Sequence, residues 1–177
     1  MGINPFETLP EVPALTVTSR AVADGEALAP RQVSAMARPD DGGDALPDLA
    51  WSGAPEGTKS FAITCYDPDA PTMSGFWHFA AFNIPADTTS IPEGAVVLGD
   101  RSGFPEAATI LRNDGGLQGF VGSAPPPGHG DHRYYFVVHA LDVETLDIDE
   151  TASPARLGFM MFGSTLARGH VMGTFGH

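Results

Sequence analysis

Residues 132–141 read His132-Arg-Tyr-Tyr-Phe-Val-Val-His-Ala-Leu141, and this stretch decides the fold class. Side chains alternate between the two faces of a β-strand. One face therefore carries His132, Tyr134, Phe136 and Val138, and the other carries Tyr135, Val137, His139 and Leu141. Both faces are largely apolar, so the pattern predicts a central strand that is covered on both sides.

Two further stretches favour strands. In residues 60–67, the period of two places Phe61, Ile63, Cys65 and Asp67 on one face. In residues 75–84, alternation places Phe76, His78, Ala80, Phe82 and Ile84 on one face, with Trp77, Phe79 and Ala81 opposite. This second stretch is apolar on both faces and is also predicted to be central. Shorter strands are predicted at residues 15–18 and 170–175, and regular structure resumes over residues 46–51.

One helix is predicted late in the chain. Ser153 is a suitable N-cap, and Pro154 is a suitable first helical residue. Apolar side chains repeat at helical spacing from Leu157, and Gly169 is typical of the position just after a helix. The pattern therefore predicts a helix that ends at Gly169.

Length and composition indicate one loop-rich domain. The chain has 177 residues, 42% of them hydrophobic, with 21 Gly and 16 Pro. Such a chain can bury one core and joins short strands by many turns. We expect an all-β fold with minor helices, a β-sandwich with a short C-terminal helix. It forms a single domain over residues 1–177, in which the Pro-rich residues 1–14 form an extended arm.

The charge excludes two classes of partner. The chain has nine basic and 22 acidic side chains, so its formal net charge is −13. Nucleic-acid binding and attachment to anionic membranes both depend on clustered Lys and Arg. Lys59 is the only lysine, and the arginines are scattered. We therefore expect no nucleic-acid partner and no membrane attachment.

The single cysteine and the first residues favour a cytoplasmic protein. Cys65 is the only cysteine, so no intrachain disulfide is possible. The first residues lack the basic and apolar regions of a signal peptide, and no segment is apolar enough to span a membrane. We expect a cytoplasmic location.

The first segment with chemical potential is Asp67-Pro-Asp-Ala-Pro71, which directly follows a predicted strand. Each proline fixes its own φ and restricts the residue before it, so the turn is stiff. A turn of this kind has an ordinary structural interpretation, in which Asp69 caps backbone amides. Asp67 indicates a functional role, because it continues an apolar face of the strand, where a carboxylate needs a hydrogen-bonding or charged partner.

The second segment runs from Gly119 to Tyr134 and leads directly into a central strand. Glycine allows close approach of backbone, and the run Pro125-Pro-Pro127 is rigid. Loops of this composition usually only connect strands. His132 and Tyr134, at the start of the strand that follows, are the reason to predict a site.

Together these segments resemble the phosphatidylethanolamine-binding protein family, in particular its bacterial Raf-kinase-inhibitor-like branch. The resemblance extends from the first strand to Phe175. Its motifs are Tyr66-Asp-Pro-Asp-Ala-Pro71, Trp77-His-Phe79 and Gly122-Ser-Ala-Pro-Pro126, the last followed by His132-Arg-Tyr134. The resemblance implies a two-sheet antiparallel β-sandwich with a small cavity for phosphate, other small anions or a phospholipid headgroup. It implies ligand-binding roles for Asp67, His78, Ala124, Pro125, Pro126, His132 and Tyr134, where Ala124 stands in place of the family's usual glycine.

The chemistry of these residues suits an anion. Two imidazoles can donate to an anion, either protonated or through one tautomer each. Asp67 would orient one of them, and Tyr134 would add a neutral donor. We expect weak binding that is strongest at mildly acid pH, no cofactor, no metal and no catalysis.

Two enzymatic alternatives use the same residues. Asp67, His78 and His132 form a set suited to iron or zinc, to which His129 adds a further ligand. A hydrolase would use Ser123 or Cys65 as nucleophile and His132 as base. The Gly-x-Ser-x-Gly elbow is absent around Ser123, and a mid-strand Cys65 is typical of an inert buried thiol.

Two kinds of protein partner are also left open. Eukaryotic relatives in the resembled family inhibit kinases or proteases, but nothing in this chain encodes a particular partner. His139 faces away from His132, so it is expected to be packed or at an interface. If that face or the late helix is uncovered, it could bury a homodimer contact.

Overall fold

The chain forms short strands with two short helical segments. The computed structural model describes residues 4–176. The elements in chain order are β1 (Thr16–Thr18), the 3-10 helix η1 (Pro30–Gln32), β2 (Leu49–Ser52), β3 (Ser60–Asp67), β4 (Phe76–Pro85), β5 (Ser90–Ile91), β6 (Thr109–Ile110), β7 (His132–Leu141), α1 (Pro154–Met161) and β8 (Thr165–Phe175). The predicted all-β class with minor helices is confirmed.

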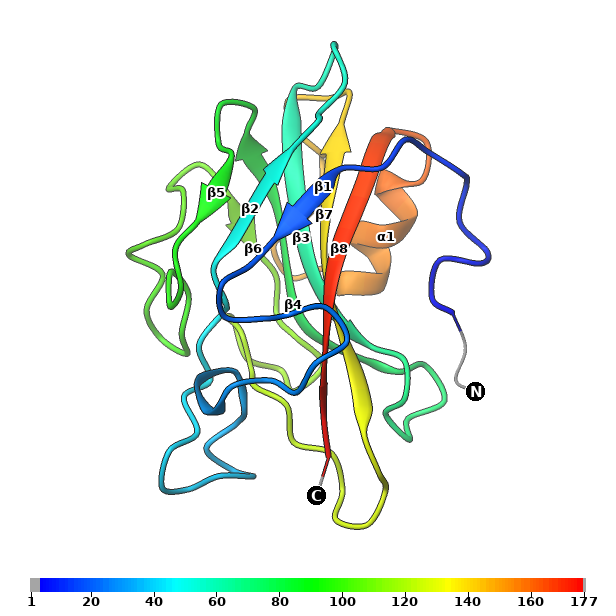
Figure 1. The fold of residues 1–177 in the computed structure, drawn as a ribbon. Helices are drawn as coiled ribbons and strands as arrows, with labels where there is room; N and C mark the ends of the chain where they lie inside the picture. The colour runs from blue at the N-terminus through cyan, green and yellow to red at the C-terminus, as the bar shows by residue number, and fades with distance from the viewer. Residues whose placement is uncertain (1–3, 177) are drawn as a thin grey trace.

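The strands form two antiparallel sheets (Figure 1). The larger sheet has the order β6-β4-β3-β7-β8, and the smaller sheet has the order β1-β2-β5. The main core lies between them and includes Trp51 of β2, Phe61 of β3 and Phe136 of β7. A second core lies on the other face of the larger sheet, where Leu157 and Met161 of α1 pack on Phe82. Burying both faces explains why the central strands are apolar throughout.

The three strands with the strongest patterns lie next to one another. β3 pairs with β4 on one side and with β7 on the other. β7 also pairs with β8 along its whole length, from His132 opposite Phe175 to Leu141 opposite Thr165. The predicted central positions of residues 75–84 and 132–141 are therefore correct.

The faces predicted for residues 75–84 are wrong, because two bulges interrupt the pairing of β4 with β3. Cys65 pairs with Phe79 and Tyr66 pairs with Trp77, which leaves His78 as an extra residue. A second irregularity lies near Asn83, whose φ is +57°. As a result Phe79, Ala81 and Ile84 face the main core, while Ala80 and Phe82 face α1. A bulge shifts the alternation by one residue and is specified by the partner strand, not by the local pattern.

The predicted helix is too long. α1 begins after the Ser153 cap as expected, with the Ser153 hydroxyl accepting from the Arg156 N–H at 3.2 Å. It ends at Met161, residues 162–164 form a turn, and residues 165–169 belong to β8. β7 offers an unpaired edge to these residues, and long-range pairing overrides local helical spacing. Gly169 is needed for a close approach, since a Cβ there would lie 2.3 Å from the Leu15 carbonyl oxygen.

The N-terminal residues lie against the outer face of the larger sheet near α1 and β8 (Figure 1). Residues 5–9 form turns, and the predicted arm includes residues 1–3, which lie outside the described part. The Phe6 ring stacks on His170 with centroids 4.7 Å apart. Further along, the Arg168 N–H donates to the Pro13 carbonyl at 3.0 Å, and Leu15 N–H donates to the Arg168 carbonyl at 3.0 Å.

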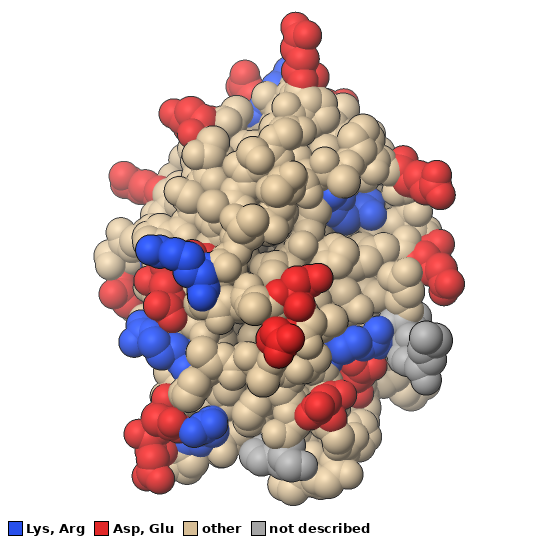
Figure 2. Space-filling model, viewed as in Figure 1, with Lys and Arg blue, Asp and Glu red and all other residues tan. Residues whose placement is uncertain are grey.

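The surface matches the acidic composition. Figure 2 shows acidic side chains spread over the viewed face, on which the Lys and Arg side chains lie apart from one another. Within residues 4–176, the helices are too short or too polar to cross a membrane. A cytoplasmic location stays a prediction.

Candidate anion-binding site

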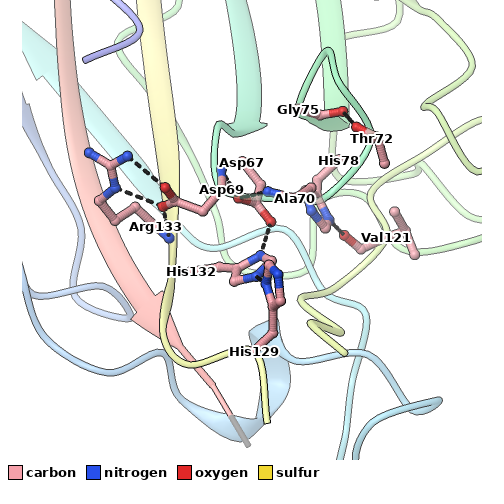
Figure 3. A network of polar contacts seen from close by, with 10 residues as sticks. All are labelled: Asp67, Asp69, Ala70, Thr72, Gly75, His78, Val121, His129, His132 and Arg133. Carbon is pink, nitrogen blue, oxygen red and sulfur yellow. Dashed lines mark hydrogen bonds and ion pairs between the residues drawn. The ribbon is translucent and has the colours of Figure 1, made fainter. Parts of the chain in front are cut away.

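Asp67 is the centre of the polar cluster at the end of β3 (Figure 3). Its Oδ1 accepts hydrogen bonds from the backbone N–H groups of Asp69 (2.7 Å) and Ala70 (3.1 Å). Its Oδ2 lies 2.7 Å from Nδ1 of His132, and both side chains are almost fully buried. Asp67 therefore has the partner that its place on an apolar face required, and Asp67 rather than Asp69 caps the turn.

A second imidazole extends this pair. Nε2 of His132 lies 2.7 Å from Nδ1 of His129. His132 donates its Nδ1–H to the Asp67 carboxylate, so a neutral His132 accepts from His129 at Nε2. His129 lies in the exposed loop before β7, whereas the other two residues are buried. The three side chains form a chain of hydrogen bonds that leads from the buried carboxylate to the surface.

His78 is held in one tautomer. Its Nδ1 lies 2.8 Å from the carbonyl oxygen of Val121, which can only accept, so Nδ1 carries the proton. The backbone repeats the link, with the Val121 N–H donating to the His78 carbonyl at 3.2 Å. Burial lowers the pKa of His78 despite that hydrogen bond and the nearby Asp67 charge. A neutral His78 therefore offers Nε2 as an acceptor, which differs from the donor role we expected.

The buried side chain of Tyr134 completes the cluster. The ring of Tyr134 meets that of His78 edge-on, with centroids 5.1 Å apart. Its hydroxyl is buried and has no hydrogen-bond partner among residues 4–176, and the same holds for the Ser123 hydroxyl. Burial and, next, the charge of Asp67 raise the pKa of Tyr134, so its hydroxyl stays protonated. Tyr134 is thus a buried donor without an acceptor.

Asp69 and Arg133 tie the turn to the start of β7. Two guanidinium nitrogens of Arg133 each lie 2.7 Å from an oxygen of Asp69, and the Arg133 backbone N–H donates to the same carboxylate at 3.0 Å. The Arg133 hydrogen bonds lower the pKa of Asp69. This pair was not predicted, because its members are 64 residues apart in the chain.

The acidic loop of residues 38–44 also supports the site. Asp44 accepts a hydrogen bond from the Gly122 N–H at 2.7 Å. Gly122 is packed so closely on the backbone of residues 33–34 that a Cβ would lie 2.4 Å from the Ser34 nitrogen. The glycine therefore fixes the loop that carries Val121 beside His78.

The structure brings Asp67, His78, His132 and Tyr134 together, since the Asp67 charge acts on both His78 and Tyr134. The remaining predicted residues lie in the loop after Ser123, where Pro125 is buried and Ala124 and Pro126 are exposed. Their contact with a ligand stays a prediction. Asp44 is the supporting residue that sequence reasoning did not assign to this site, whereas His129 and Ser123 were considered there only for the enzymatic alternatives.

Ser123 and Cys65, the nucleophiles of the hydrolase alternative, are both buried. In the part of the chain that the structure describes, no three His, Cys, Asp or Glu side chains converge as a metal site would require. The Ser123 hydroxyl makes no hydrogen bond to an imidazole within residues 4–176. Burial raises the pKa of Cys65 well above its ordinary value, which keeps it a thiol.

The comparison with known families agrees with the motifs. The sequence model of the phosphatidylethanolamine-binding protein family matches residues 18–176. The chain belongs to this family. Among its relatives, the UPF0098 protein YbhB of Escherichia coli K12 is 43% identical over 162 residues, which cover 91% of this chain and 99% of YbhB. YbcL of the same organism is 44% identical over 160 residues, with 89% of this chain and 85% of YbcL covered.

Solved structures of phosphatidylethanolamine-binding proteins share the fold. The crystal structure of E. coli YbcL, described as a new member of the mammalian family, matches with a TM-score of 0.86 at 41% identity, covering 92% of this chain and 98% of YbcL. A putative family homologue from Chlamydia trachomatis matches with a TM-score of 0.75 at 27% identity, covering 93% and 98%. The predicted family is confirmed, and these bacterial relatives fit the predicted bacterial branch.

Proposed function

We propose that this family member binds a small phosphate-bearing ligand, such as inorganic phosphate, a phosphomonoester or a phospholipid headgroup, and is not an enzyme. The ligand would lie between His78, Tyr134 and the Asp67–His132 pair. The observation that carries the proposal is the buried Tyr134 hydroxyl, which has no acceptor within residues 4–176. An unpaired buried donor is costly, and a ligand oxygen would satisfy it.

The tautomer of His78 supports a ligand that carries its own proton. The Nδ1–H of His78 is used by Val121, so Nε2 is the nitrogen left for a ligand. Monohydrogen phosphate, or the monoanion of a phosphomonoester, has a P–OH group that can donate to this nitrogen while another oxygen accepts from Tyr134. A phosphodiester headgroup has no P–OH group, so it would only accept from Tyr134. The Nε2 of His132 is bonded to the exposed His129, so a ligand that reaches it would displace His129.

The acidity of the protein sets how the ligand would be recognised. With a net charge of −13, long-range attraction of an anion is unfavourable. Binding would depend on short-range hydrogen bonds, and raising the concentration of a salt with a non-competing anion would leave affinity unchanged or slightly higher. Competition between a soluble phosphoester and a captured protein partner would place that partner's interface at this site.

Calorimetric titration with phosphate and with phosphoethanolamine tests the proposal. Tyr134→Phe removes only the hydroxyl and should weaken binding by at least about tenfold, as expected for a hydrogen bond to a charged group. Tyr135→Phe is the matched control, because Tyr135 lies on the opposite face of β7 and should keep full affinity. Equal affinity in both variants would place the ligand elsewhere. Turnover of phosphoesters would favour the hydrolase instead.

A further inference from the structure

A cavity lies on the face of the larger sheet opposite to the Asp67 side chain. It has a volume of about 350 Å³ and is enclosed by the N-terminal residues 4–12, the outer face of β3, β4 and β7, and the end of α1. That volume is within the range of about 300–1,000 Å³ that is usual for small-molecule sites. None of the phosphate-site residues lines it.

The walls of this cavity are mainly aromatic. Tyr66 and Trp77 pack together with ring centroids 4.4 Å apart, and both line the cavity. Opposite them, the Phe6 ring meets Tyr135 edge-on with centroids 5.5 Å apart. Such walls favour an apolar ligand, because apolar surface is removed from water on both sides.

One cation among these walls has no anionic partner. Arg168 lines the cavity and is partly buried, and no carboxylate of residues 4–176 forms an ion pair with it. Its Nε is buried without a hydrogen-bond partner, and its guanidinium lies 5.8 Å from the centre of the Phe6 ring. Burial lowers the pKa of Arg168. In a chain with many more acids than bases, an Arg without an acid is available to an external anion.

The other titratable groups around the cavity neither neutralise Arg168 nor add a second positive charge. His139 lies opposite Arg168 in the β7–β8 pairing and lines the cavity. Burial lowers its pKa to about 3, so it is neutral near pH 7. Glu7 is the acidic residue of the lining, and its side chain is exposed to solvent. Arg168 is therefore the positive charge that faces the cavity.

A glycine in α1 keeps the space open. Gly158 lies in the middle of the helix, where glycine is less favourable than alanine. No packing demands it, because a Cβ at this position would meet nothing within 4 Å. Gly158 lines the cavity, so a larger side chain there would occupy it.

We propose that this cavity binds a small apolar carboxylate, with the carboxylate paired to Arg168 and the hydrocarbon part against Tyr66, Trp77 and Phe6. The class of ligand follows from one unpaired cation in an otherwise aromatic and aliphatic cavity. This site is independent of the proposed phosphate site, since the two lie on opposite faces of the larger sheet.

The charge dependence is tested by titrating 4-phenylbutyrate and its neutral isostere 4-phenylbutyramide by calorimetry. The acid should bind at least about tenfold more tightly than the amide. Arg168→Gln should remove this difference, because it should weaken the binding of the acid and leave the affinity for the amide unchanged. Arg156→Gln is the matched control, because Arg156 is an exposed arginine of α1 that does not line the cavity. Equal binding of acid and amide to the wild type, or an equal loss in both variants, would overturn the proposal.

Filling the cavity tests its location without touching Arg168. Gly158→Leu should fold at least as stably as the wild type and lose at least about tenfold in affinity for 4-phenylbutyrate. Tyr134→Phe should leave that affinity unchanged, which separates this site from the phosphate site. Amide NMR signals of Gly158 and Trp77 should shift on addition of the acid. Full affinity in Gly158→Leu, with unchanged signals at these residues, would contradict the assignment.

Discussion

Arg133 holds both carboxylate oxygens of Asp69, with two nitrogen–oxygen distances of 2.7 Å. The pair links the turn after β3 to the first residues of β7, directly beside His132. Because His132 and Asp67 sit on these same two segments, the Asp69–Arg133 pair holds their hydrogen bond in register. We therefore treat it as the positioning element of the site.

Replacing Asp69 with Asn should lower the free energy of unfolding by about 1.5–3 kcal/mol, the range for hydrogen bonds to charged groups. Asp41→Asn is the matched control. Asp41 makes the same bidentate contact with Arg38 at 2.7 Å, but both side chains are more than 40% exposed. The control should cost less than about 1 kcal/mol. Urea denaturation of both variants measures the difference, and equal losses would argue against a special role for Asp69.

The Asp69–Arg133 pair should also account for part of the loss of stability at acid pH. Because Arg133 lowers the pKa of Asp69 in the folded protein, the stabilisation is fully present above the unfolded value of about 3.9 and is lost as pH falls through the lower folded value. The Asn variant should therefore lose less stability than the wild type between about pH 4 and pH 2. If the difference in free energy of unfolding between the wild type and the Asn variant did not shrink on acidification, this prediction would be contradicted.

His139 should make the protein less stable in mild acid. Burial lowers its folded pKa from 6.5 to about 3, so the unfolded chain binds a proton that the folded chain does not. Stability therefore falls as pH drops from the unfolded value toward the folded one, by about 2 kcal/mol between pH 7 and pH 5 from this residue. The lowered pKa of His78 acts in the same direction. Denaturation between pH 7 and pH 5 should show that the free energy of unfolding of His139→Gln depends less steeply on pH than that of the wild type. An unchanged pH dependence would rule out His139 as the cause.

His78 should be visible as a single neutral tautomer. Since Nδ1 donates to Val121, nitrogen NMR at pH 7 should show a protonated Nδ1 and an unprotonated Nε2. Its titration midpoint should lie below the ordinary value of 6.5, because burial lowers the pKa. Addition of a phosphomonoester should shift the Nε2 signal. Observation of the opposite tautomer would remove the acceptor role that we propose for this residue.

Two glycine substitutions should change stability in opposite directions. Gly122→Ala forces a Cβ to within 2.4 Å of the Ser34 nitrogen and should cost about 1–3 kcal/mol. Gly158→Ala meets no atom within 4 Å in a helix interior and should stabilise by up to about 1 kcal/mol. Thermal melts of the two variants check the pair. Equal effects of the two substitutions would mean that the close packing of Gly122 carries no cost.

Local pattern was sufficient to predict the three central strands but not every face of them. β3, β4 and β7 were predicted because burial on both faces leaves an apolar signal that a single segment contains. The faces of β4 were not, because the extra residue at His78 exists only relative to β3. The helix end was missed for the same reason, since residues after Met161 pair with β7, which lies earlier in the chain.

The candidate site, too, was predicted only in part from the sequence. The sequence by itself determined the family and the candidate residues Asp67, His78, His132 and Tyr134, because motif order and residue chemistry are written along the chain. Only the tertiary structure decided which atoms meet: the Asp67–His132–His129 chain, the Asp69–Arg133 pair and the unpartnered Tyr134 hydroxyl. Hydrogen bonds depend on distances of a few tenths of an ångström between residues far apart in sequence, and only the packing of the sheets sets those distances.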